Sequence, residues 1–172
     1  MDPLPFDDES TLLVRTDFSD QEGWEALRRT CREGLAEVTE PCFVDDRAYE
    51  GATVEELLEL VSEEETFILV ADRVTLSHED DAPLLAVDTF RDFEEDEGDE
   101  GEGDEYGQRF RVGLTGLRSV VVNLSLANTD FDEFAESAGE DGVFRGIVPA
   151  SLSDGKDQEL LESFRAYRRG EG

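Results

Sequence analysis

The sequence is short of lysine, histidine and cysteine, and these shortages exclude several classes of site. Lys156 is the only lysine, His78 is the only histidine, and the two cysteines, Cys31 and Cys42, do not form a Cys-x-x-Cys pair. One histidine and two separated cysteines cannot assemble a Cys/His zinc site. The thiols are therefore expected to stay reduced, as in a cytosol. Direct nucleic-acid binding is not expected either, because it requires clustered lysine and arginine.

Long apolar runs and familiar catalytic motifs are also missing. No apolar stretch is long enough to span a bilayer, and residues 1–10 have neither the basic nor the apolar region of a signal peptide. We therefore expect a cytoplasmic protein that does not enter membranes. No GxSxG, GxxxxGK[ST] or HExxH motif is present. The sequence assigns no catalytic residue, and it favours a protein that is not an enzyme.

What the chain has in excess is acid. It contains 46 acidic and 15 basic residues, which give a formal net charge of −31. Residues 91–106 hold ten of the acids and one arginine, so 36 acidic residues face 14 basic ones elsewhere. A dedicated acidic tail, or a nucleic-acid mimic, would leave a nearly neutral body. The even spread instead favours adaptation to molar salt, which screens the repulsion among like charges.

The order of patterned segments predicts a single α/β domain. We expect a disordered lead-in over 1–10, an α/β domain over 11–150 with an acidic loop insertion at 91–106, and a C-terminal helix extension over 151–172. The sheet is expected to be mixed, mostly parallel and about five-stranded, with flanking helices. Strands are expected at 11–17, 42–45, 67–72, 84–88 and 108–114, with a short edge strand at 144–148.

Helix starts and ends are marked by side chains that cap. Ser19 with Glu22, and Thr53 with Glu56, have the spacing of capping boxes that begin helices. Residues 117–128 fit both a helix and a strand, and we favour the helix. The junction at 127–130 predicts that one helix ends with Asn128 in the left-handed conformation and that another begins. A terminal helix is expected over 157–169.

Four predicted strands end in aspartate, namely Asp17, Asp45, Asp72 and Asp88. Ligands of open α/β sheets bind beyond the carboxyl ends of the strands, and gathered carboxylates there would suit Mg²⁺. More than a quarter of the residues are acidic, however, and aspartate is a common turn residue. A structural role is therefore favoured, and no cofactor is predicted, with Mg²⁺ kept as the alternative.

Three segments carry a family resemblance: TLLVRTDFSD at 11–20, FILVADRVTL at 67–76 and NLSLANTDFDEFAESAGEDGVFRGI at 123–147. They resemble an uncharacterised bacterial and haloarchaeal family, a domain of unknown function, with LVRTDFSD, VADR and NLSxANxDFxEFA…DGVFRGF motifs. Ile147 stands where the last motif has phenylalanine. The resemblance implies a small α/β domain and a helical 117–128, and it brings no activity. The polar residues that the motifs and strand ends single out as binding candidates are Arg15, Asp17, Asp72, Arg73, Asp88, Asn123, Asn128, Asp130 and Arg145.

We therefore expect a non-enzymatic module that binds an unknown protein partner and is adapted to high salt. The alternatives are an Mg²⁺-dependent enzyme that uses the strand-end aspartates and an acidic nucleic-acid mimic, which the even spread of charge disfavours. The sequence does not indicate an oligomeric state.

Overall fold

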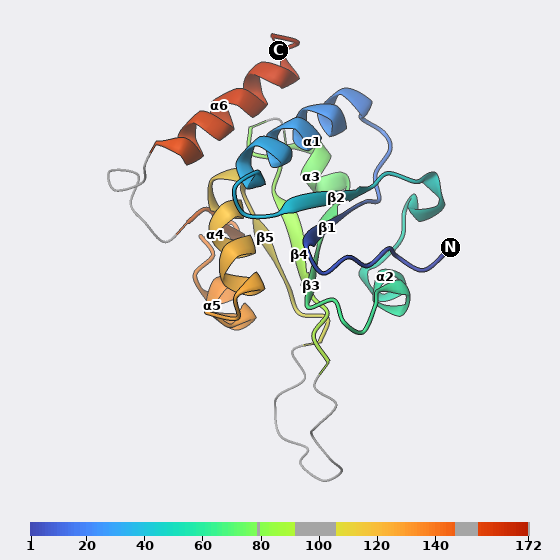
Figure 1. The fold of residues 1–172 in the computed structure, drawn as a ribbon. Helices are drawn as coiled ribbons and strands as arrows, with labels where there is room; N and C mark the ends of the chain where they lie inside the picture. The colour runs from blue at the N-terminus through green and yellow to red at the C-terminus, as the bar shows by residue number, and fades with distance from the viewer. Residues whose placement is uncertain (79, 92–105, 147–154, 172) are drawn as a thin grey trace, which may run out of the picture.

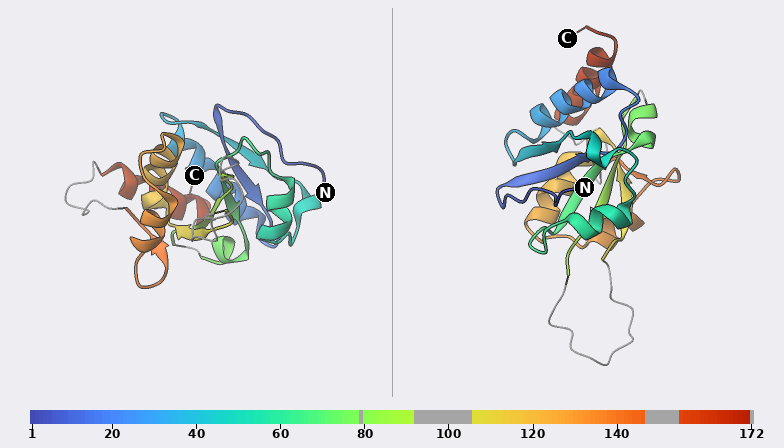
Figure 2. Two further views of the ribbon diagram at one scale, coloured as in Figure 1. Left: turned by 90° about the horizontal axis from the view of Figure 1, so that it is seen from below. Right: turned by 90° about the vertical axis from the view of Figure 1, so that its right-hand side faces the viewer.

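The computed structural model has one six-stranded sheet with helices on both faces (Figures 1 and 2). It describes residues 1–78, 80–91, 106–146 and 155–171, so the interior of the acidic insertion lies outside the described residues. The elements are β1 (Ser10–Arg15), α1 (Gln21–Leu35), β2 (Glu40–Val44), the 3₁₀ helix η1 (Arg47–Tyr49), α2 (Val54–Leu60), β3 (Phe67–Ala71), α3 (Arg73–Ser77), β4 (Leu84–Asp88), β5 (Arg109–Val112), α4 (Leu114–Ser125), α5 (Phe131–Glu136), β6 (Val143–Phe144) and α6 (Lys156–Arg168).

The strand order is β2-β1-β3-β4-β5-β6. β1 pairs in parallel with β2 and β3, β4 runs antiparallel to β3 and β5, and β6 is parallel to β5. This confirms the mixed, mostly parallel α/β fold and the antiparallel β4–β5 pair. We call the end of the sheet where β1, β2 and β3 finish the carboxyl edge, and the opposite end, where β4 finishes, the amino edge.

The two faces of the sheet bury separate cores. Alternate strand residues point to opposite faces, so Leu13 and Leu69 join one core while Val14 and Val70 join the other. The first core lies under α1, α4, α5 and α6, and the second lies under α2 (Figure 1). Because α1 and α2 cover opposite faces, the chain changes side between β1 and β3.

Part of the N-terminal lead-in, for which disorder is predicted over 1–10, packs against the second core. Leu4 is buried and its N–H donates to the carbonyl of Leu60 at 2.9 Å. The Tyr49 hydroxyl donates to the carbonyl of Asp2 at 2.8 Å. One apolar side chain in a polar segment, together with two backbone contacts, is enough to hold the lead-in beside α2.

One predicted helix cap is confirmed and the other is wrong. Thr53 and Glu56 form the expected capping box at the start of α2. At α1 the cap is Asp20 rather than Ser19: the Asp20 carboxylate accepts the Gly23 N–H at 2.8 Å. The Ser19 hydroxyl instead donates to Asp17 at 2.8 Å, which closes the turn after β1.

Residues 114–125 form α4, so the helical interpretation of this segment is confirmed. The helix ends through Ala127, not through Asn128, because Ala127 takes the left-handed conformation with φ of 52°. The N–H of Asn128 donates to the carbonyl of Asn123, and that of Ala127 to Leu124, which is the pattern of a Schellman cap. A side chain at this position costs about 1 kcal/mol relative to glycine.

The last two predicted elements are present with shifted bounds. β6 is an edge strand of two residues, and residues 147 and 148 of the predicted strand lie outside the described residues. α6 covers Lys156–Arg168 and lies across α1 (Figure 1). Within the described ranges, no helix has the length and apolar character that a membrane span requires.

Candidate functional site

The candidate residues do not form one cluster. Four of them, Arg15, Asp17, Asp72 and Arg73, lie at the carboxyl edge where β1 and β3 end. Arg145 follows β6 at the same edge, farther along the sheet. The others are Asp88, which ends β4 at the amino edge, and Asn123, Asn128 and Asp130, which belong to the α4–α5 junction.

Arg15 is the centre of the polar network at the carboxyl edge. Its side chain is 1% exposed, although it carries a charge. Nη1 donates to Asp45 Oδ1 at 3.0 Å and to Gln21 Oε1 at 2.9 Å, and Nε donates to the carbonyl of Asp17 at 2.8 Å. Asp45 also accepts the indole N–H of Trp24 at 2.9 Å. The network ties the ends of β1 and β2 to the first turns of α1.

Aromatic rings complete the surroundings of this guanidinium. Its Cζ lies 4.2 Å from the centroid of the Phe18 ring and 5.1 Å from that of Trp24. Nη2 of Arg15 is buried without a hydrogen-bond partner, and so is Nε of Arg28, which stacks near Trp24 and Phe43. Contacts of cations with aromatic faces offset part of the cost of these unmade hydrogen bonds.

Asp72 and Arg111 form the second ion pair at this edge. Both guanidinium nitrogens donate to the carboxylate, with Nη1–Oδ1 at 2.8 Å and Nη2–Oδ2 at 2.7 Å. Burial opposes ionisation of Asp72, but hydrogen bonds from Arg111 and Thr75 outweigh it and lower the pKa of the carboxyl. Asp72 also caps α3 through the N–H of Thr75. Arg73 is exposed at the start of α3.

Asp17, Asp72 and Asp88, which the Mg²⁺ alternative requires to lie together, do not converge. β4 runs antiparallel to β3, and Asp88 pairs with Phe67, the first residue of β3, so it lies at the other end of the sheet. Among the described residues, no three acidic, histidine or cysteine side chains are grouped so that they would hold a metal ion. Asp72 is engaged by Arg111, and Asp17 holds the turn at Ser19.

Arg145 serves the edge strand β6. It pairs with Asp81 at 2.9 Å and with Asp141 at 2.7 Å. The hydrogen bond from Arg145 lowers the pKa of Asp141, and the backbone N–H of Val143 adds to the effect. Arg145 thus fastens the return strand to the segment before β4, in agreement with a structural role.

The amino edge carries a hollow of about 280 Å³. It lies between the start of β3, the end of β4 and the α4–α5 junction. Its lining residues are Thr66, Phe67, Asp88, Phe90, Leu124, Ala127, Thr129, Asp130 and Phe131. Two of the nine candidate residues, Asp88 and Asp130, are therefore brought together here, as acids on an otherwise mainly apolar surface.

The rim of the hollow is open and apolar. Phe90 is 57% exposed and Leu126, next to the lining residue Ala127, is 64% exposed. Asp130 occupies the cap position of α5 without making a side-chain cap bond. Asp88 is buried, and its Oδ1 accepts the N–H of Phe90 at 2.8 Å, which fixes the backbone on that side. Ala127, whose left-handed conformation closes α4, lies at the same rim.

The sequence profile of the family described as Domain of unknown function (DUF6924) matches residues 10–147. The chain belongs to the DUF6924 family. No curated protein matches the sequence. The matched DUF6924 region contains both the Arg15 network and the hollow at the amino edge, and it ends before α6.

Three residues of the polar networks at the carboxyl edge could not be identified from the sequence. Arg111 lies between the buried Phe110 and Val112 of β5, and because side chains of a strand alternate between its faces, this pattern gives no sign of the ion pair with Asp72. Trp24 packs in the core, and its indole N–H also donates to Asp45. Phe18 has no sequence signal, because its role depends on the position of Arg15.

Glu65 makes the stability of this DUF6924 protein depend on pH. The residue is 8% exposed, and burial raises its pKa from 4.5 to about 7. The folded state therefore binds the proton more tightly than the unfolded state, and the free energy of unfolding decreases as pH rises through this window. Glu65→Gln should be nearly neutral at about pH 5 and should stabilise by roughly 2 kcal/mol at about pH 8.

Urea unfolding at the two pH values, in the same KCl concentration, measures this difference. Glu64→Gln, at the exposed neighbouring position, is the matched control and should leave the pH profile unchanged. An equal gain for Glu65→Gln at both pH values would contradict the prediction.

Proposed function

We propose that this DUF6924 protein is a non-enzymatic protein-binding module that acts in the cytoplasm of a cell with molar internal salt. The observation that carries the proposal is the hollow at the amino edge, with Phe90 and Leu126 on its rim. Large apolar side chains that stay more than half exposed beside a concave apolar surface are typical of a protein-binding site.

The hollow fits one large apolar side chain of the partner. Phe67, Leu124 and Phe131 line it and offer apolar contact, and covering Phe90 and Leu126 would remove further apolar area from water at about 25 cal/mol per Å². A partner residue such as phenylalanine or leucine would act as the anchor of the interface, with the surrounding contacts excluding water.

The charge of the rim favours a lysine or arginine next to the apolar anchor residue of the partner. None of the lining residues is lysine or arginine, and Asp130 presents its carboxylate at the edge. The chain as a whole carries a charge of −31, so an acidic segment would be repelled. We therefore assign the partner as a protein segment in which a large apolar residue stands next to lysine or arginine.

Molar salt determines how much charge attraction and burial of apolar surface each contribute to binding. The acidic residues are spread over the whole chain, and their mutual repulsion is screened in molar KCl. The same screening weakens the attraction between Asp130 and a basic residue, so burial of apolar surface supplies most of the affinity. Charge then acts mainly as a filter against wrong partners.

Capped tetrapeptides of sequence Gly-Phe-Arg-Gly, Gly-Phe-Glu-Gly and Gly-Ala-Arg-Gly provide the test, titrated into isotope-labelled protein in molar KCl. The first peptide is expected to shift the amide resonances of Phe90, Leu126 and Asp130, and the other two to bind more weakly. Leu126→Ser should weaken binding of the first peptide roughly tenfold, because about one buried apolar side chain is lost.

Val74→Ser is the matched control, since Val74 is an exposed apolar residue on α3 at the carboxyl edge. This variant should bind like the unmodified protein. Equal binding of all three peptides, or resonance shifts away from the hollow, would sink the proposal.

A further inference from the structure

Two glycines of α1 lie against side chains of α6. A Cβ at Gly34 would lie 2.7 Å from a methyl group of Leu160, and a Cβ at Gly23 would meet the guanidinium of Arg168. Gly34 is near the end of α1 and Leu160 is near the start of α6, so the helices run antiparallel. A side chain at either glycine would displace the end of the α6 side chain that meets it, and at Gly23 it would also meet the carboxylate of Asp20, the N-cap of α1.

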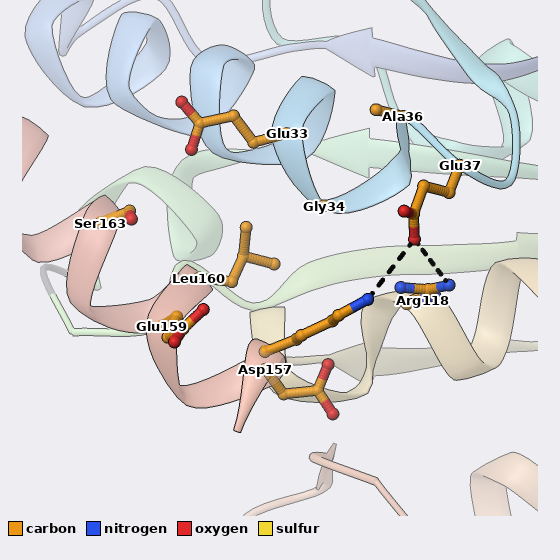
Figure 3. Close-up of a pocket in the computed structure, with 10 residues that line it drawn as sticks. Glu33, Gly34, Ala36, Glu37, Arg118, Asp157, Glu159, Leu160 and Ser163 are labelled. Carbon is orange, nitrogen blue, oxygen red and sulfur yellow. Dashed lines mark ion pairs between the residues drawn. The ribbon is translucent and has the colours of Figure 1, made fainter. Parts of the chain in front are cut away.

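The rest of the contact combines a small apolar centre with charged ends. Leu161 and Phe164 of α6 are buried in the core shared with α1 and α4. At one end, Glu37 accepts ion pairs from Lys156 at 3.7 Å and from Arg118 of α4 at 3.3 Å (Figure 3). At the other end, Arg168 pairs with Asp20, the N-cap of α1.

Charge matches the two helices to each other. α6 brings Lys156 and Arg168 to carboxylates at the two ends of α1, and Arg165 to Asp80 before β4, in a chain with only 15 basic residues. α1 and its flanks answer with Asp20, Glu33 and Glu37, and the Tyr167 hydroxyl donates to Glu33. An unrelated acidic helix would bring carboxylates against these acids, whereas another copy of α6 brings the complementary cations.

α6 is also separate from the family-matched region. The DUF6924 profile ends at residue 147, and α6 begins at Lys156. The helix rests mainly on α1 and α4 and adds no strand to the sheet. Its release would leave every strand pairing of the sheet intact and would uncover the face of α1 that carries Gly23 and Gly34.

We propose that the α1–α4 face is a helix-docking surface that also takes α6 from a second copy of this chain. Two copies that exchange α6 regain each contact of the single chain, so the exchanged dimer loses no packing. The proposal concerns a surface away from the hollow at the amino edge and does not depend on the proposed function. The exchange is favoured by high protein concentration.

The single lysine makes a sharp test possible in the unmodified chain. A water-soluble carbodiimide joins a carboxylate and an amine in direct contact into an amide, and Lys156 is 3.7 Å from Glu37. Isotope-labelled and unlabelled protein are concentrated together in molar KCl, diluted and crosslinked at once. Mass spectrometry of the digest then shows whether each Lys156–Glu37 pair comes from one copy or from two.

Crosslinked Lys156–Glu37 pairs that join a labelled to an unlabelled copy are expected to be absent from protein kept dilute. After concentration they should reach the share that random exchange between copies gives, and light scattering should detect a dimer. Glu37→Gln is the control that should abolish this crosslink in every sample. Same-label pairs alone at all concentrations, with a monomer throughout, would overturn the proposal.

Discussion

Asp45→Ala is expected to lower the free energy of unfolding by about 3 kcal/mol, because it leaves a buried cation without its carboxylate. Arg15 is 1% exposed and cannot turn to water, and Trp24 loses the acceptor of its indole N–H in the same change. Urea unfolding at fixed KCl concentration measures the effect, since the stability depends linearly on urea.

Arg15→Met is the informative counterpart of this variant. It removes the charge while keeping most of the volume, and it leaves Asp45, which is 29% exposed, in contact with water and with Trp24. The expected cost is about 1 kcal/mol. If Arg15→Met destabilised the protein more than Asp45→Ala, the buried guanidinium would not be the group that needs compensation.

Phe164→Ala is expected to destabilise the protein by about 3 to 4 kcal/mol, because it opens a cavity in the first core. Phe164 is 1% exposed and is the deepest contact of α6. Differential scanning calorimetry or urea unfolding at fixed salt gives the change, which should appear in one cooperative transition.

Tyr167→Phe is the control on the same helix. It keeps the ring, which lies 4.2 Å from the Arg29 guanidinium, and removes only the hydroxyl that donates to Glu33. The expected change is within about 0.5 kcal/mol, as for most surface positions. A loss for Phe164→Ala no larger than this would mean that α6 contributes little to the folded unit.

Much of the fold could be predicted from local patterns. The apolar runs at β3 and β4 and the Thr53–Glu56 box give elements whose identity depends on neighbouring residues alone. The long acidic sequence between β4 and β5 contains no helix pattern, and this correctly indicated an antiparallel pair. The direction of β4 relative to β3 was the feature that local patterns did not give.

The direction of β4 determines at which edge of the sheet Asp88 lies. The connection from β3 to β4 covers residues 72–83 and its helix, α3, has only five residues, whereas a parallel crossover usually contains a full helix that returns along the sheet. The chain therefore turns back, and Asp88 arrives at the amino edge instead of beside Asp72. The sequence identified several of the polar residues, but their grouping depends on strand direction.

The left-handed Ala127 shows a second limit of sequence reasoning. Asn128 has the higher intrinsic tolerance for this conformation, but the hydrogen bonds that close α4 place the left-handed residue one position earlier, at Ala127. At α1 the cap is likewise one position away from the predicted one, at Asp20, where the carboxylate also meets Arg168 from the far end of the chain.

The packing of the terminal helix leaves a mark on α1 at position 34. A Cβ there would lie 2.7 Å from Leu160 of α6, so a side chain at this position must displace Leu160 while α6 is seated. A homologue without this helix meets no such contact, and alanine there would strengthen α1. Glycine at this position is therefore the residue that a homologue with a terminal helix is expected to keep.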